Sequence, residues 1–561
     1  MTYALSSGVT GLQAHQKMLD VAGNNLANLN TTAFKASRIT FEELLSQTIE
    51  QGSQPTDLVG GTNPEQIGSG VGVSGITPNT EQGSIVNTGN PLDVAIEGAG
   101  YFVVRNGEQY LYTRAGAFGI DAAGRLVDPS TGYRVQRIGL TGEPLPQESY
   151  GFQVPGDSSI RVPYGVALPA KATSEISVSG NLSSDATGAP RAQVLTSSLQ
   201  YTYDGGREAT DAVELDQLNQ FSGGSPLNRT IKVSGYHPDG TAFSNGQGFD
   251  VDGSTTLGDL IDHLNTLLSG RATASLVNGR IRVTDDQTGY SQSDISLSYE
   301  PAAGTGDLKM PSYFELTTVG GDEVKNVNIA MYDSKGTKHV LSAALVRTAE
   351  ANTWDMILTS VSGNVESISP DNRRINGLAF NAQTGAFAGA PLGEETQFVI
   401  TFDGFESQPQ TVAINLGTPN SFDGLTQFGG NSTAVAREQD GYEAGDLSAV
   451  SVDNEGVLIG AFSNGIKKEI AALQVALFNN PAGLQSVGGG YYVPSANSGE
   501  VATQATRSGA GSIHGGALEK SNADVATEFV NMIEAQNGFQ ANARTIRVAT
   551  DILRELTSLI R

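Results

Sequence analysis

The sequence contains no cysteine, which excludes a disulfide framework, a thiolate metal site and a cysteine nucleophile. No run of about 20 apolar residues occurs, so we expect no transmembrane span. The N-terminal stretch lacks the basic and apolar regions of a signal peptide, so any export is expected to proceed without a cleaved signal. Histidines are few and scattered, and their spacing predicts no metal site: His15, His237, His263, His339 and His514.

Basic residues are also scarce. The chain has 33 Lys and Arg against 59 Asp and Glu, a net charge of −26. Nucleic-acid binding needs a cationic face, so it is disfavoured. Charged residues make up only 16% of the chain, whereas Gly numbers 69, which is typical of many short strands and turns. With 561 residues, several domains are expected.

A leucine recurs every seven residues near the N-terminus. This spacing predicts an amphipathic helix over about residues 3–29. Core packing within one globular domain is the plainer alternative to a role in assembly. The seam consists of Leu5, Leu12, Leu19, Leu26 and Leu29, with Gly8, His15 and Ala22 between them. An Asn-rich stretch then ends the helix, because these side chains compete for backbone hydrogen bonds.

The middle of the chain favours strands. Residues 41–50 look locally helical and 51–70 look like a loop, but from about 71 to 505 apolar and polar residues alternate, with Gly at the breaks. Two helices are expected to interrupt this pattern. One covers 255–268 behind a threonine cap, and the other covers about 464–479.

A second long amphipathic helix is expected at the C-terminus, capped by Ser521 and Asn522. It could span about 36 residues, or about 54 Å. Its apolar seam consists of Val525, Phe529, Met532, Phe539, Ala543, Ile546, Leu553 and Ile560. Two such helices predict an antiparallel pair, and the apolar surface that a pair leaves over predicts further copies of the chain.

The sequence offers no convincing catalytic or cofactor site. The FDVDG stretch at 249–253 fails as a calcium loop, because Ile261 stands where the loop needs Glu. Asp285 and Asp286 form a carboxylate pair in a turn pattern and are expected to be solvated. The Gly-rich run at 487–490 lacks the Lys of a phosphate loop. We therefore expect no enzyme, no cofactor and no metal.

Both ends of the chain carry sequence signatures. The stretch GNNLANLNTTAFKAS (23–37) and the stretch ALEKSNADVATEFVNMIEAQNGFQANARTIRVATDIL (517–553) resemble the ends of the flagellar rod, hook and hook-associated axial proteins. The first match rests on Asn24, Asn25, Leu26, Ala27, Asn28, Asn30, Thr31, Phe34 and Lys35. The second rests on Ser521, Asn522, Asp524, Gln536, Gln540 and Asn542. Ala33 departs from the pattern, because Gly is common there in this family.

Interior motifs resemble the hook proteins in particular. They include VNTGNPLDVAIEGAGYFVV (86–104), NIAMYDSKGTKHVL (328–341) and DGLTQF (423–428). The length argues against a distal rod protein, which lacks large outer domains. A distal rod protein, a hook-associated axial protein and, less favoured, a secreted adhesin remain the alternatives.

The resemblance implies a mixed, mainly β fold, with nested β-rich domains on an antiparallel coiled coil of the two terminal helices. The expected parts are an inner helical domain (1–30 with 525–561), a connecting segment (31–70 with 506–524), a β domain (71–175 with 430–505), an outer β domain (176–195 with 311–429) and an inserted outermost domain (196–310).

The resemblance also implies a function. The chain would be a subunit of a curved tubular homopolymer, the flagellar hook, which acts as a universal joint between rod and filament. The implied partners are further copies of the chain, the distal rod protein, the hook cap, the hook-filament junction protein and the flagellar export apparatus. The implied location is extracellular, with no nucleic acid and no membrane as partner.

Overall fold

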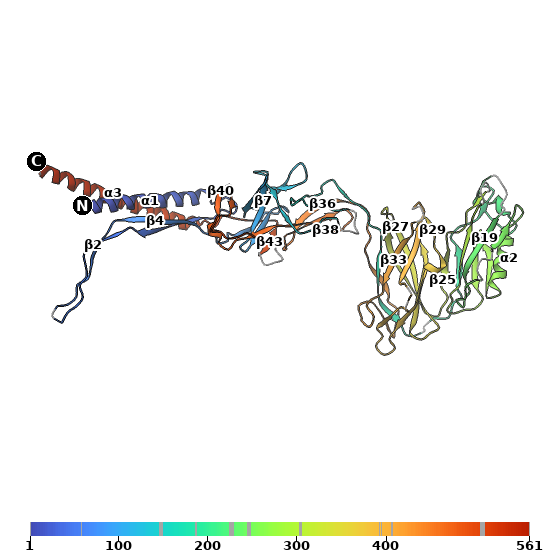
Figure 1. Cartoon of the computed structure of the whole chain (residues 1–561). Helices are drawn as coiled ribbons and strands as arrows, with labels where there is room; N and C mark the ends of the chain where they lie inside the picture. The colour runs from blue at the N-terminus through green and yellow to red at the C-terminus, as the bar shows by residue number, and fades with distance from the viewer. Residues whose placement is uncertain are drawn as a thin grey trace. The chain divides into compact units, whose positions relative to one another are not determined.

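The computed structural model describes residues 2–57, 59–144, 150–185, 188–223, 229–243, 248–301, 306–391, 393, 395–404, 408–504 and 511–559. The chain forms two compact units, drawn in Figure 1. Unit 1 comprises Met1–Ala167 and Asp446–Arg561, and unit 2 comprises Leu168–Gly445. Strands predominate, as expected, and the two long helices lie at the chain ends.

Unit 1 contains both terminal helices, α1 (Thr2–Ala27) and α3 (Val525–Leu559), which contact each other. Small side chains line the contact. A Cβ added at Gly11 would lie 2.7 Å from the Asn542 side chain, and one added at Gly538 would lie 2.4 Å from the His15 ring. Glycine therefore sets how closely the two helix backbones approach.

A long hairpin follows α1. Its base pairs β1 (Ser37–Glu43) with β4 (Val71–Pro78), and its distal part pairs β2 (Ser46–Glu50) with β3 (Glu65–Gly68). The predicted helical character of 41–50 is wrong, and the predicted loop at 51–70 is wrong where β3 forms. The apolar residues of β1 pair across the hairpin, Ile39 with Ile76 and Phe41 with Val73, so cross-strand pairing overrides the weak helical pattern.

The rest of unit 1 is a β domain. Its largest sheet runs in the order β40 (Gln485–Gly488), β41 (Tyr491–Val493), β8 (Gln109–Thr113), β7 (Tyr101–Asn106), β11 (Arg134–Val135), β10 (Leu126–Val127) and β9 (Gly119–Ile120). In the same sheet, β39 (Val475–Leu477) pairs with β7 and with β42 (Ala502–Gln504). Two small pairs join β5 (Ile85–Asn87) to β44 (Ala517–Glu519) and β6 (Val94–Glu97) to β43 (Ser512–Gly515). These pairs hold residues 512–519, which precede α3, beside residues 85–97, which follow the hairpin.

A second sheet of this domain contains β12 (Arg137–Ile138), β38 (Lys467–Leu473), β37 (Val457–Phe462) and β36 (Gly445–Val452) in that order. The helix predicted at 464–479 is therefore wrong. Ile470, Ala471 and Leu473 are fully buried in β38, a strand that pairs with β37 and β12. A short run of buried apolar residues fits a helix or a strand equally well, and tertiary pairing decides between them. The chain passes between the units at β13 (Ala167–Leu168).

Unit 2 has two adjoining cores. One lies between two sheets. The first contains β26 (Val324–Tyr332), β27 (Lys338–Arg347), β28 (Thr353–Val361), β30 (Arg374–Phe380) and β31 (Phe387–Gly389). The second contains β29 (Val365–Ser367), β32 (Gln397–Phe402), β33 (Gln410–Asn415), β14 (Glu175–Ser183), β34 (Leu425–Phe428) and β35 (Val435–Gln439).

The other core fills the region predicted as an insertion. Its strands are β15 (Val194–Ser197), β19 (Arg229–Tyr236), β20 (Gly248–Val251), β21 (Ala272–Val277), β22 (Arg280–Asp285), β23 (Asp294–Tyr299) and β25 (Phe314–Thr318), with the short pairs β16 (Thr202–Tyr203) with β17 (Arg207–Glu208) and β18 (Phe221–Ser222) with β24 (Asp307–Leu308). The predicted helix at 255–268 is confirmed as α2 (Leu257–Leu268), capped by Thr256.

The inserted region packs closely on the neighbouring sheet. Its core includes Ala344, Val346 and Ile357 from β27 and β28. The buried Arg373 guanidinium lies 3.2 Å from the Asp294 carboxylate. Asp285 is also buried and accepts a hydrogen bond from Ser293, so its predicted solvation is wrong.

Candidate functional site

The signature residues at the two chain ends meet in unit 1, where the chain leaves α1 and returns into α3. The turn after α1 bonds to the strand before α3: the Ala33 amide donates to the Glu519 carbonyl at 2.9 Å, and the Asn522 amide donates to the Phe34 carbonyl at 3.2 Å. Ala33 has φ +57°, a left-handed conformation that Gly adopts without strain. This geometry would favour Gly at position 33, in line with the expected family pattern.

A buried charge cluster forms the centre of this junction. The Lys35 ammonium lies 2.6 Å from Glu519 Oε1, and an Arg114 nitrogen lies 3.5 Å from Glu519 Oε2. All three side chains are almost completely buried. The Gly83 amide also donates to Glu519 Oε1, and Lys35 donates to the Glu81 carbonyl. We call Lys35, Arg114 and Glu519, together with Asn25 and Asn522, the terminal clasp.

Burial dominates the electrostatics of the clasp. It lowers the pKa of Lys35, although the hydrogen bond and the charge of Glu519 partly oppose that effect. Burial likewise raises the pKa of Tyr101, whose ring lies 4.9 Å from the Arg114 guanidinium carbon. Two cations share a single buried carboxylate, so the stability of the cluster depends on Glu519.

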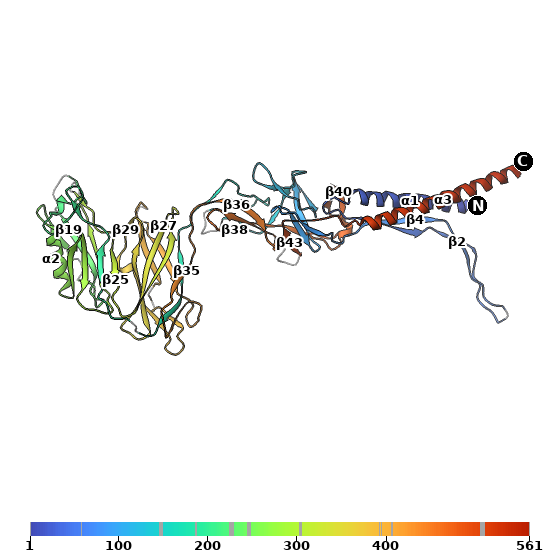
Figure 2. The ribbon, with the colours of Figure 1, turned by 180° about the vertical axis from the view of Figure 1, so that it is seen from behind.

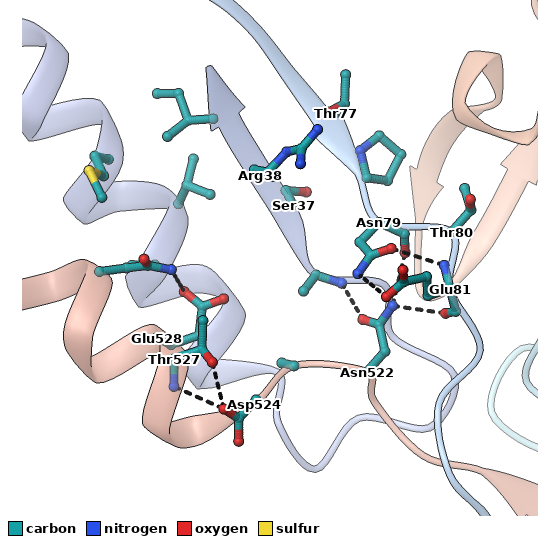
Figure 3. A pocket seen from close by; sticks show the side chains of 18 residues that line it. Ser37, Arg38, Thr77, Asn79, Thr80, Glu81, Asn522, Asp524, Thr527 and Glu528 are labelled. Carbon is teal, nitrogen blue, oxygen red and sulfur yellow. Dashed lines mark hydrogen bonds between the residues drawn. The ribbon is translucent and has the colours of Figure 1, made fainter. Parts of the chain in front are cut away.

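Two asparagines extend the clasp on either side. Asn25 exchanges hydrogen bonds with the Ser37 backbone and donates to Glu528 on α3 at 2.9 Å. Asn522 accepts from the Ala36 amide at 2.7 Å and donates to the Asn79 and Glu81 carbonyls, as Figure 3 shows. Each amide satisfies backbone groups that would otherwise be left unpaired where the chain changes direction.

The start of α3 differs from the prediction. The helix begins at Val525, and the Asp524 carboxylate accepts hydrogen bonds from the Thr527 amide and hydroxyl (Figure 3). These bonds lower the pKa of Asp524. Ser521 and Asn522 therefore do not cap the helix, because Asn522 is engaged with the hairpin. A largely polar groove of about 750 Å³ lies beside this junction, between α1, the hairpin and the first turns of α3.

Other signature residues lie outside the clasp. Asn28 bonds back to Asn24, and Thr31 donates to Asn28, so these side chains stabilise the end of α1 locally. Asn542 lies against Gly11 in the helix contact. Leu26 and Phe34 are half-buried, and Ala27, Asn30, Gln536 and Gln540 are exposed.

The structure buries Gly8 and Ala22 of the predicted seam, whereas the large apolar residues of the seam are only half-buried or exposed. The buried positions are Gly8, Gly11, Ala14, Ala22 and Asn25 on α1, and Glu528, Ala535 and Ala549 on α3. The seam residues Leu5, Leu12, Leu19, Leu26, Leu29, Met532, Phe539, Ala543 and Ile546 are half-buried. Val525, Phe529 and Leu553 are exposed, and Ile560 lies outside the described residues.

The arrangement suits holding chain segments together. Among the residues that the structure describes, no group of three or more His, Asp or Glu could hold a metal ion. The same residues include no helix long and apolar enough to cross a membrane. Arg114, Glu519 and Glu528 were not predicted as site residues from the sequence. Glu519 lies inside the quoted C-terminal signature, and a search for the acidic partner of Lys35 could have found it.

Sequence-family models match four segments of the chain. They are "Flagella basal body rod protein" (5–35), "Flagellar hook protein FlgE/F/G D1 domain" (95–183), "Flagellar basal body protein FlaE D2 domain" (314–442) and "Flagellar basal body rod FlgEFG protein C-terminal" (514–559). The first and last contain the clasp residues of the two chain ends.

Full-length relatives are also found. The chain is 30% identical to flagellar hook protein FlgE of Borreliella burgdorferi and 31% identical to that of Treponema pallidum, with 100% of both chains covered in each case. A flagellar basal-body rod protein FlgG of Bacillus subtilis is 40% identical but matches only 29% of this chain and 61% of its own length. The crystal structure of Helicobacter pylori flagellar hook protein FlgE2 gives a TM-score of 0.36 at 17% identity, covering 72% of this chain and 93% of that one. The 30% and 31% identities over the whole length of the two hook proteins show that the chain belongs to the flagellar hook protein family.

Proposed function

We propose that the chain, a structural subunit of the flagellar hook, polymerises into a curved tube that acts as a universal joint between rod and filament. The observation that carries the proposal is the apolar surface of α3. The α1–α3 contact uses small residues, and large apolar side chains stay exposed, among them Val530 at 53% and Ile533 at 56%. Exposed apolar faces of this kind mark protein–protein contacts, and a homopolymer supplies the partner from further copies.

The terminal helices are proposed to form an antiparallel coiled coil. The order of their contacts supports this pairing. Gly8 lies against Ile546, His15 against Gly538, and Asn25 bonds to Glu528, so the contact moves down α3 as it moves up α1. The buried Glu528, Ala535 and Ala549 lie seven and then fourteen residues apart, and these multiples of seven fit such a seam.

The predicted nested organisation is proposed, with the boundary between the two units at 167/168 and 445/446 in place of the predicted 175 and 430. Separate hydrophobic cores in unit 1 and unit 2 support it, since the chain leaves unit 1 near 167 and returns near 446. Residues 506–510 of the connecting segment lie outside the described residues. The shared core of the insertion and the outer sheet favours movement of these two parts as one body.

The proposed setting is the outside of the cell, after passage through the flagellar export apparatus. The proposed contacts beyond copies of the chain are the distal rod protein, the hook cap and the hook-filament junction protein. A rod subunit is the less favoured alternative, because the rod relative matches less than a third of this chain.

Removing exposed apolar side chains from α3 tests the proposal. We expect Val530→Ser with Ile533→Ser to leave a folded monomer that does not form sedimentable tubes. The control Asn537→Ser with Ala541→Ser changes exposed positions on the same helix and should polymerise like the unaltered chain. Failure of the unaltered chain to polymerise, or equal polymerisation of both variants, would contradict the proposal.

A further inference from the structure

The distal part of the hairpin, which we call the acidic arm (residues 44–69), is largely exposed where it is described, although the Tyr3 hydroxyl of α1 donates a hydrogen bond to Gln47. Every residue of β2 is exposed, and Leu45 and Ile49 are 83% and 63% exposed. Figures 1 and 2 show β2 leading away from α1 and α3. An isolated two-stranded hairpin is marginally stable in water, so the arm needs a surface that covers it.

The charge of the arm indicates the chemistry of that surface. No Lys or Arg occurs between Arg38 and Arg105, while the arm carries Glu50 and Glu65 directly opposite each other on β2 and β3. Like charges at facing positions of an antiparallel pair are destabilising. A covering surface must therefore be partly apolar and must carry positive charge.

The β domain of unit 1 presents a positively charged, partly aromatic surface of this kind. Arg105 on β7 and Arg134 on β11 are also directly opposite each other. Neither makes an ion pair within the described part of the chain, and the Arg105 Nε is buried without a hydrogen-bond partner. The Arg105 guanidinium carbon lies 5.5 Å from the ring centroid of Tyr110, whose side chain is exposed. Among the described residues, no carboxylate forms an ion pair with this cluster of two cations and one aromatic ring.

We propose that the acidic arm of one copy docks on the Arg105–Arg134 pair of a second copy, with the Glu50 and Glu65 carboxylates bound by the two guanidiniums. The facing glutamates repel each other, and so do the facing arginines. When the two pairs meet, each guanidinium can bind one carboxylate through two parallel hydrogen bonds, which removes both repulsions. Within one chain, no ion pair joins them among the described residues, so the partner is another copy. The inference rests on the proposed polymerisation and adds a specific contact to it.

Charge reversal tests the contact. Glu50→Arg with Glu65→Arg, or Arg105→Glu with Arg134→Glu, should each raise the critical concentration for polymerisation about tenfold, equivalent to about 1.4 kcal/mol. Combining all four changes should restore it. Asp57→Arg, an exposed change on the same arm, is the control and should have little effect. A thermal melt of each variant shows whether the loss of Arg105 impairs folding. If it does, the single variant Arg134→Glu tests the contact without changing Arg105.

Because the chain has no cysteine, a directed cross-link gives a second readout. A Glu65→Cys chain copolymerised with an Arg134→Cys chain should give a disulfide-linked dimer on oxidation. Replacing the second chain by Lys17→Cys should give none. If the unaltered chain does not polymerise, the proposed function fails. If tubes form but the reversals act no more strongly than Asp57→Arg, or no specific dimer appears, the docking inference fails and the proposed function stands.

Discussion

Replacement of Glu519 by Gln should destabilise unit 1 by about 3–5 kcal/mol, the usual cost of removing one partner from a buried ion pair. The side chain of Glu519 is fully buried and is the carboxylate that faces both Lys35 and Arg114. Gln keeps the shape but leaves two buried cations without a counter-charge. The free energy needed to deprotonate Lys35 sets an upper limit on the stability that its stranded charge can cost in this variant. Moving a lysine from its ordinary pKa of 10.5 to the neutral form at pH 7 costs about 5 kcal/mol, and burial already lowers the pKa of Lys35.

Urea unfolding of unit 1, followed by hydrogen exchange in β5 and β44, measures the loss. The double variant Glu519→Gln with Lys35→Met removes one of the stranded cations and should recover part of the stability. In the single variant the folded-state pKa of Lys35 falls further, so its stability should rise as pH increases toward 10.5, the ordinary value. A single variant within about 1 kcal/mol of the unaltered chain, or a double variant no more stable than the single, would refute this account of the clasp.

Two further predictions concern the helix contact and the acid side of the pH range. Gly11→Ala should weaken the α1–α3 contact, since the added Cβ would lie 2.7 Å from the Asn542 side chain, whereas Gly23→Ala, with nothing within 4 Å, should stabilise α1 by up to about 1 kcal/mol. Circular dichroism during thermal unfolding compares the two, and equal effects would contradict the close-approach argument. Burial alone would raise the pKa of Asp440 in unit 2, but hydrogen bonds from Ser174, Glu175 and Lys171 lower it to about 2. The carboxylate therefore contributes stability above its ordinary pKa of 3.8 that is lost as pH falls toward 2, so the stability difference between the unaltered chain and Asp440→Asn should shrink over that interval.

Long-range repetition made the terminal helices predictable. Seven-residue spacing over many turns identified α1 and α3, and the threonine and apolar pattern identified α2. The helix predicted at 464–479 is wrong because the three-residue spacing of Ile470 and Leu473 fits a helix, whereas both side chains are buried in the strand β38. Pairing with β37 decides the outcome, and a local pattern carries no information about that partner.

The site was only partly predictable for a similar reason. Lys35 and Asn522 stood out because they lie in the signature stretches. Arg114 lies far from both stretches and enters the clasp only through the fold of the β domain. The helix seam was predicted mainly from large apolar residues, with Gly8 and Ala22 between them on α1. The buried Gly11 and Ala535 were not predicted, because apolar spacing does not indicate where close backbone approach requires small side chains.

The separation of Lys35 and Glu519, 484 residues along the chain, has a consequence for timing. The Lys35–Glu519 ion pair cannot form until both segments of the chain are present. While a chain is still being synthesised, or is threaded from one end through a narrow passage, α1 therefore lacks the contacts of the terminal clasp. The clasp therefore forms only when both signature segments are present in the same folded chain.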